Sequence, residues 1–235
     1  MKLAKYFTKT EIAIWSISII FILSSFMIFD RENYLTLIAS LIGVTSLIFC
    51  AKGNPIGQVL MVFFSLIYAY ISFSFSYYGE LMTYAGMTLP MAVLALVSWL
   101  KNPYEGKKSE VKVYSVSKKD ITFMIIRTVI VTVVFYFILK YFNTANIIPS
   151  TISVTTSFIA VYLTYKRSPY FALAYAANDI VLIILWIMAS LTDAKYICVT
   201  VCFAVFFIND IYGFINWQRM KRRQNNLKSI GGCFD

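Results

Sequence analysis

Histidine is absent from this chain of 235 residues, and charged residues are scarce. Without histidine, a histidine general base, a His-dependent catalytic triad and a His-ligated metal site are all excluded. Charged residues make up 14% of the chain and apolar residues 60%, whereas a soluble domain is about a quarter charged and about half apolar. This composition indicates an integral membrane protein, and we expect neither enzymatic activity nor a bound cofactor.

Cysteine is also rare, and the four cysteines show no disulfide framework: Cys50, Cys198, Cys202 and Cys233. Cys198 and Cys202 are one helical turn apart, a spacing that a soft metal could use. Small residues at a contact between membrane helices are the simpler interpretation. We therefore expect no metal site.

Apolar residues are concentrated in eight stretches, each long enough to cross a hydrocarbon core of about 30 Å as a helix. They cover residues 11–29, 34–51, 56–78, 81–100, 120–142, 147–165, 169–191 and 196–217. The first stretch is too long for the apolar part of a signal peptide and no small-residue cleavage site follows it, so we expect a retained helix. The sequence predicts an all-α membrane protein with eight transmembrane helices.

Basic residues are divided unequally between the two sides of this predicted membrane. If all eight stretches span, one side carries seventeen lysines and arginines, and the other carries three: Arg31, Lys140 and Lys195. The positive-inside rule then places both termini in the cytoplasm. Because basic clusters beside a membrane also attract anionic lipid, at about 1 kcal/mol per residue, the net charge of +10 needs no nucleic acid. We expect a lipid partner and no nucleic-acid binding.

Two parts of the chain share a pattern that predicts an internal repeat. In each, a basic residue lies three positions before a proline, and a tryptophan lies two positions before a basic residue. The first copy runs from 52–55 to 99–101, and the second from 166–169 to 217–219. Four spans separate the copies, so they enter the membrane in the same direction and form a parallel repeat. Chance is the alternative, because these residue types are common at membrane interfaces.

The repeat predicts five parts. They are an extra N-terminal helix in 1–33, a three-helix bundle in 34–101, a cytoplasmic loop and linker helix in 102–146, a second three-helix bundle in 147–218 and a basic cytoplasmic tail in 219–235. Transporters built on such repeats bind substrate between the repeats, near the middle of the bilayer.

Polar side chains inside the predicted spans are candidate binding residues, because their burial in lipid is costly. Asn178 and Trp186 share one face of the seventh span, and Asn209 and Asn216 share one face of the eighth, with Tyr212 at its edge. Amides, a phenol and an indole could bind a planar heterocycle that carries hydroxyl groups. Hydrogen bonding between helices is the alternative for each residue.

Two carboxyl groups accompany these amides. Asp179 and Asp210 either hold a cation or a proton, or orient the neighbouring amides and tyrosines. Gln58, near the cytoplasmic end of the third span, is a further candidate for substrate binding.

Three motifs resemble the PnuC family of bacterial vitamin transporters. They are Trp-Leu-Lys-Asn-Pro at 99–103, Asn-Asp at 178–179 and Asn-Asp-Ile-Tyr-Gly-Phe-Ile-Asn-Trp at 209–217. The resemblance covers roughly residues 34–225 and implies a 3+1+3 fold, similar to a full-length SWEET transporter, with an extra N-terminal helix. It implies facilitated diffusion of nicotinamide riboside across the bacterial inner membrane, followed by trapping through cytoplasmic phosphorylation, and a homo-oligomer such as a trimer. Carried onto this sequence, it implies binding by Asn209, Tyr212, Asn216 and Trp186, and by Gln58.

One departure from the family pattern leaves the substrate open. Nicotinamide riboside carriers of this family have two tryptophans three positions apart on the penultimate helix, whereas here Ile183 precedes Trp186. Thiamine, riboflavin or a deoxynucleoside are therefore alternative substrates. A ligand-binding membrane sensor subunit is the rival class, although only eighteen residues follow Trp217 to serve as an effector.

Overall fold

The computed structural model describes residues 6–74, 78–144 and 146–231. Within these residues, eight helical spans are long and apolar enough to cross a membrane, which confirms the predicted number of spans. The helices are α2 (Lys9–Phe29), α3 (Tyr34–Ala51), α4 (Ile56–Ser74), α5 (Tyr78–Thr83) continued by η1 (Tyr84–Thr88) and α6 (Leu89–Lys101), α7 (Lys118–Tyr141), α8 (Ile147–Tyr165), α9 (Phe171–Ser190) and α10 (Ile197–Gly231).

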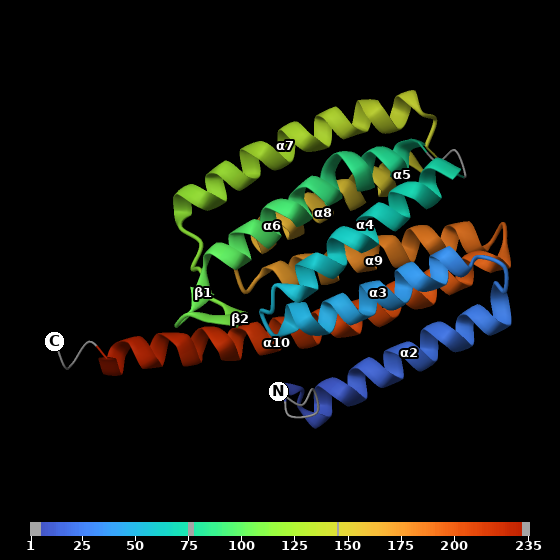
Figure 1. The fold of residues 1–235 in the computed structure, drawn as a ribbon. Helices are drawn as coiled ribbons and strands as arrows, with labels where there is room; N and C mark the ends of the chain where they lie inside the picture. The colour runs from blue at the N-terminus through green and yellow to red at the C-terminus, as the bar shows by residue number, and fades with distance from the viewer. Residues whose placement is uncertain (1–5, 75–77, 145, 232–235) are drawn as a thin grey trace.

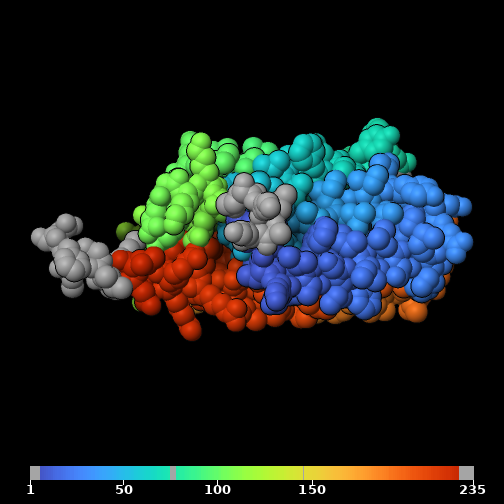
Figure 2. Space-filling model, turned by 60° about the horizontal axis from the view of Figure 1, so that its bottom comes forward, coloured from blue at the N-terminus to red at the C-terminus, as the bar shows by residue number. Residues whose placement is uncertain are grey.

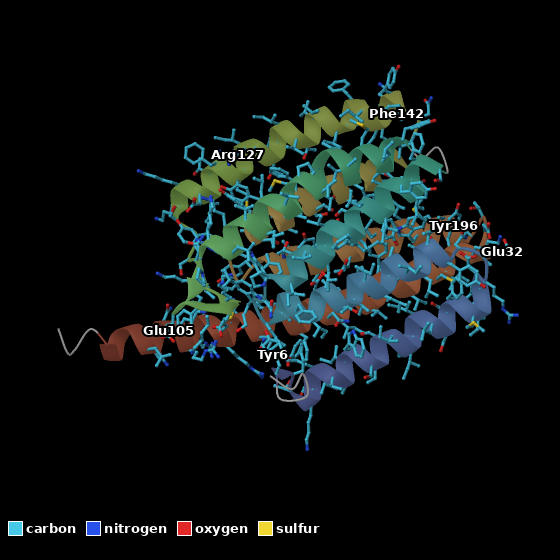
Figure 3. The ribbon with its side chains drawn as sticks, in the orientation of Figure 1. Tyr6, Glu32, Glu105, Arg127, Phe142 and Tyr196 are labelled. Atoms are coloured by element: carbon cyan, nitrogen blue, oxygen red, sulfur yellow. The ribbon has the colours of Figure 1, made fainter. Side chains whose placement is uncertain are left out.

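The spans lie side by side, and the start of α2 and the end of α10 are at the same end of the molecule (Figure 1). We call this end the terminal face; its described residues are 6–8, 52–55, 102–117, 166–170 and 218–231. The opposite end, the distal face, comprises residues 30–33, 142–144 and 191–196. Figure 3 shows Tyr6 and Glu105 at the terminal face and Glu32, Phe142 and Tyr196 at the distal face.

Two three-helix bundles pack into a ring. In the first, α4 contacts both α3 and α6; in the second, α9 contacts both α8 and α10. The ring closes where α6 meets α8 and where α3 meets α10. Helix α7 packs on α8, and α2 lies along α3 and α10 (Figure 2). This is the predicted 3+1+3 arrangement with an extra N-terminal helix.

The extra helix and the linker helix begin in the same way. Thr8 accepts a hydrogen bond from the backbone N–H of Glu11, and the Glu11 carboxylate accepts one from the backbone N–H of Thr8. Ser117 and Asp120 form the same capping box at the start of α7. Because the first N–H groups of a helix have no partner within it, each box fixes where its helix begins.

The fourth span contains one turn of π-helix, η1, which widens the helix next to Pro90. Proline has no N–H to donate to the carbonyl four residues earlier, so the regular ladder cannot continue through it. The backbone N–H of Leu89 instead reaches Tyr84, five residues back, and the Thr88 hydroxyl reaches the Thr83 carbonyl. Such π-turns are frequent at functional sites.

The connection between the bundles differs from the loop that the sequence predicts. Strands β1 (Pro103–Tyr104) and β2 (Lys107–Val111) form an antiparallel hairpin on the terminal face. The segment after Trp217, predicted to be a tail, continues α10 to Gly231. The two elements support each other, because Gln224 on α10 bonds to the backbone of Val111 and Val113. The hairpin segment lies against α10 in Figure 2.

Candidate functional site

A cavity of about 620 Å³ occupies the centre of the ring, between the two bundles. At the distal end it reaches Asn143, Thr192 and Tyr196, and at the terminal end it stops at Cys50 and Gln58. Its volume is within the range of small-molecule sites, roughly 300–1,000 Å³. Its position between repeats is where transporters of this architecture bind substrate.

Aromatic rings make up much of the cavity wall. Tyr84 of η1, Trp186 of α9 and Tyr196 line it. Tyr84 is stacked from outside the cavity by the ring of Tyr68, with centroids 4.9 Å apart, and Trp186 packs against Tyr196, with centroids 5.4 Å apart. The other aromatic side chains that line the cavity include Phe64, Phe171, Tyr175, Phe203 and Phe206. Ring faces of this kind stack on planar heterocycles and attract cations.

An amide is held in place near the middle of the wall. The side-chain oxygen of Asn178 accepts hydrogen bonds from the hydroxyls of Thr156, at 2.8 Å, and Ser153, at 3.2 Å. Neither bond uses the N–H donors of the amide. Because Asn178 lines the cavity, a fixed amide with spare donors is well placed to bind a hydroxyl or carbonyl oxygen of a ligand.

The ionisable side chains with a carboxyl group are the charged residues that line the cavity. Glu80, Asp179 and Asp210 line it, and no lysine or arginine does so within the described residues. Asp179 and Asp210 are both buried, and Oδ2 of Asp179 has no hydrogen-bond partner among the described residues. Carboxyl groups that line a cavity without a basic partner disfavour anions there.

The predicted site residues divide into two groups in the structure. Trp186, Asn178, Gln58, Asp179 and Asp210 line the cavity, and the amide of Gln58 also donates to the thiol sulfur of Cys50 at 3.3 Å.

The remaining three, all on α10, face the neighbouring helices instead. The amide of Asn209 donates to the Ser18 hydroxyl, at 2.9 Å, and to a carbonyl of its own helix, and Tyr212 donates to the Glu11 carboxylate at 3.2 Å. The amide of Asn216 donates to the Ala51 carbonyl at 2.8 Å. In this conformation these side chains hold α2 and α3 against α10, and their role in binding stays a prediction.

Several cavity residues were not among the candidates. Ser150, Ser153 and Ser157 line it from α8 at helical spacing, and a search for polar residues at that spacing on the sixth span would have found them. Glu80 lies too close to the predicted interface to stand out, because charged residues are common there.

A model of the family described as nicotinamide mononucleotide transporter matches residues 33–219. The chain belongs to this family. The resemblance to PnuC proteins is thereby confirmed, as is the prediction of a transporter rather than an enzyme. The protein is a multi-pass membrane protein, in agreement with its eight candidate spans among the described residues.

Individual members of the nicotinamide mononucleotide transporter family are distant in sequence. The chain is 23% identical over 217 residues to the nicotinamide riboside transporter PnuC of Neisseria mucosa, covering 91% of this chain and 82% of that protein. It is 22% identical to the PnuC of Haemophilus influenzae, covering 83% of each. The crystal structure of the vitamin B3 transporter PnuC superimposes with a TM-score of 0.79 at 21% identity, over 93% of this chain and 94% of that one. The folds are therefore the same.

Proposed function

We propose that the protein carries nicotinamide riboside across the bacterial cytoplasmic membrane by facilitated diffusion, with the terminal face in the cytoplasm. The arriving riboside is trapped there by phosphorylation. The protein works in contact with membrane lipid as a homo-oligomer, such as a trimer. The observation that carries this proposal is the acidic, aromatic cavity between the bundles.

Nicotinamide riboside matches the cavity group by group. Its pyridinium ring is a planar cation, which aromatic faces and a nearby negative charge both stabilise. Its carboxamide and ribose hydroxyls can pair with the Asn178 and Gln58 amides and with the serines of α8. The relatives named nicotinamide riboside transporters support the same substrate.

The cavity disfavours the phosphorylated form of the same vitamin. Nicotinamide mononucleotide adds a phosphate, and an anion taken out of water is costly unless basic groups or several hydrogen-bond donors replace its hydration. None of the described residues that line the cavity is basic, and three are acidic. The charge distribution therefore favours the riboside over the mononucleotide.

Purified protein in liposomes tests the proposal. We expect labelled nicotinamide riboside to equilibrate across the membrane without an ion gradient, and unlabelled mononucleotide to compete at least about 100-fold more weakly. Thiamine is the critical competitor, because it is also a cationic heterocycle and because Ile183 occupies the position of the first family tryptophan. Uptake of thiamine, riboflavin or a deoxynucleoside with no riboside uptake would reject the substrate and keep the transport function.

Glu80→Gln tests the electrostatic contribution to riboside binding, because glutamine keeps the shape of the side chain and removes the carboxyl group. Replacing this cavity-lining carboxyl group, which can carry a negative charge, with a neutral amide should weaken riboside binding by up to about tenfold and narrow the discrimination against the mononucleotide. Glu32→Gln is the matched control, because Glu32 lies at the distal face, is exposed, pairs with Lys195 and is outside the cavity. Titration calorimetry of both variants with both ligands provides the comparison.

A further inference from the structure

Two tryptophans fill the space between the cavity and the terminal face. Trp99 at the end of α6 and Trp217 on α10 are both 0% exposed, and their ring centroids are 5.5 Å apart. On the cavity side they pack against Phe171, which lines the cavity floor. On the other side Val111 of the hairpin, also 0% exposed, belongs to the same buried cluster. A solute in the cavity cannot reach the terminal face while these rings stay in place.

Each indole is hydrogen-bonded to the opposite bundle. Trp99 of the first bundle donates from Nε1 to the carbonyl of Thr164 on α8, at 2.9 Å. Trp217 of the second bundle donates from Nε1 to the carbonyl of Cys50 on α3, at 2.8 Å. The bonds are reciprocal: the last helix of each bundle is tied to the first helix of the other.

A second pair of bonds repeats this exchange. Ser98, which precedes Trp99, donates to the carbonyl of Tyr165, and Asn216, which precedes Trp217, donates to the carbonyl of Ala51, both at 2.8 Å. Each of these carbonyls belongs to the residue that follows the acceptor of an indole bond. Tyr165 and Ala51 are the last residues of α8 and α3, where helix carbonyls lack partners within the helix. The bonds from Ser98 and Asn216 therefore satisfy two end carbonyls, whereas the carbonyls of Cys50 and Thr164 also accept from the backbone N–H groups of Gly53 and Arg167.

The two sets of hydrogen-bonded residues occupy equivalent positions in the two copies of the repeat. Trp99 and Trp217 end the two copies of the pattern, and Cys50 and Thr164 each lie five positions before its proline, Pro55 or Pro169. The two sets of hydrogen bonds are related by the repeat axis. A rotation of one bundle against the other that breaks one set therefore strains the other set equally, and both open together. Rigid-body rocking of repeats is how transporters of this architecture expose a site to alternate sides.

We propose that Ser98, Trp99, Asn216 and Trp217 form a reciprocal latch that closes the terminal end of the cavity, and that substrate leaves through this end only when both indole bonds break. Asn216 is then a gate residue. The latch applies to whichever vitamin the protein carries, and it rests on the proposed function only for the direction of release.

Cys50 is a built-in reporter of the latch, because it lines the cavity floor and its own carbonyl accepts the Trp217 bond. With Cys198, Cys202 and Cys233 replaced by alanine, Cys50 is the only thiol. A membrane-impermeant methanethiosulfonate reagent is applied to right-side-out or inside-out membrane vesicles without substrate. In the parent, we expect faster modification from the distal side. In Trp99→Phe and in Trp217→Phe we expect modification from the terminal side to accelerate about fivefold, the effect of losing one buried hydrogen bond.

Trp15→Phe is the matched control. It removes the same kind of bond, from an indole to the Thr45 hydroxyl, at an exposed position outside the latch. We expect no change in the rate on either side. Because the assay needs no substrate, its result is independent of the riboside assignment.

The sidedness of the reaction decides between a latch and a structural role. An unchanged rate from the terminal side, or equal acceleration from both sides, overturns the proposal, since general loosening would expose Cys50 in both directions. If the phenylalanine variants do not elute as monodisperse protein, Ser98→Ala is the second test. It removes one hydroxyl and should raise the rate from the terminal side about twofold to fivefold, and an unchanged rate again overturns the proposal.

Discussion

The orientation of Asn178 in the cavity wall is set by two hydroxyls of α8 that donate to its side-chain oxygen. Asn178→Ala removes the amide donors from the cavity wall and leaves those hydroxyls in place. We expect riboside affinity to fall about tenfold, the typical effect of removing a well-placed hydrogen-bonding group. The melting temperature should change little. Titration calorimetry and a thermal melt in detergent measure the two effects separately.

Asn209→Ala is the matched comparison one helix away. The Asn209 amide bridges α10 to Ser18 on α2, so its removal should lower the melting temperature by several degrees and leave affinity within about twofold. Loss of affinity in Asn209→Ala without loss in Asn178→Ala would instead support the binding role that helical spacing suggests for α10.

Spacing along a helix identifies which residues share a face, but not what that face contacts. On α9 the shared face of Asn178 and Trp186 is turned to the cavity. On α10 the face of Asn209 and Asn216 is turned to α2 and α3. The rotation of each helix about its axis is set by its neighbours, which the sequence of a single helix does not contain. Residue type and depth therefore indicate which polar faces lie inside the membrane, but the packing decides which of them faces the cavity.

At the scale of elements, two ion pairs occupy matching positions. Lys52, just after α3, pairs with Glu11 in the capping box of α2 at 3.0 Å, and Lys166, just after α8, pairs with Asp120 in the capping box of α7 at 2.7 Å. The two ion pairs therefore sit at equivalent places beside the two three-helix bundles. The packing around the two pairs differs, because α7 packs mainly on α8, whereas α2 packs on both α3 and α10.

The pair on the second half predicts an alkaline limit to stability. The hydrogen bond to Asp120 raises the pKa of Lys166 above its ordinary value of 10.5. A raised lysine pKa stabilises the folded state fully below the ordinary value, and this contribution is lost as the pH rises through the folded value. We expect Lys166→Gln to melt roughly 2 °C below the parent from pH 6 to 9.5, and the difference to shrink above pH 10.5.

Lys107→Gln is the control for that titration, because Lys107 is exposed on the hairpin and its pairing with Glu105 is weak. Its melting curve should follow the parent at every pH. A Lys166→Gln difference that stays constant up to pH 11.5 would show that the charge of Lys166 contributes nothing and that only its packing matters.

The helices were predictable from the sequence and the hairpin was not. Apolar runs of membrane-spanning length specify helices strongly, because backbone groups in lipid must be satisfied within the segment. The hairpin depends on partners far along the chain: Val111 donates to the carbonyl of Gly53, and Gln224 holds Val111 and Val113. Its lysine-rich sequence, read locally, has the composition of a loop. The extension of α10 beyond Trp217 likewise depends on contacts with a distant segment, the hairpin.

At the scale of the whole molecule, the latch and the cavity define one conformation. The cavity reaches the distal face and is closed at the terminal face, so the two ends are not equivalent, as a parallel repeat allows. A parallel repeat orients both halves in the same direction across the membrane. Two pairs of equivalent groups can therefore meet at one end while the other end remains open. Which end faces the cytoplasm then decides whether this conformation receives or releases substrate.

The distribution of charge predicts that orientation. Arg31 is exposed at the distal face, among three basic residues on that predicted side, whereas Lys107 is exposed on the hairpin, on the side with seventeen. In a cysteine-free background, we expect Arg31→Cys to react with an impermeant maleimide only from outside the cell and Lys107→Cys only from the cytoplasm. Labelling of both from one side would contradict an odd number of crossings between them. Labelling of each from the opposite side would keep the eight spans but invert the molecule, so that the conformation described here would be open to the cytoplasm and the latch would gate entry instead of release.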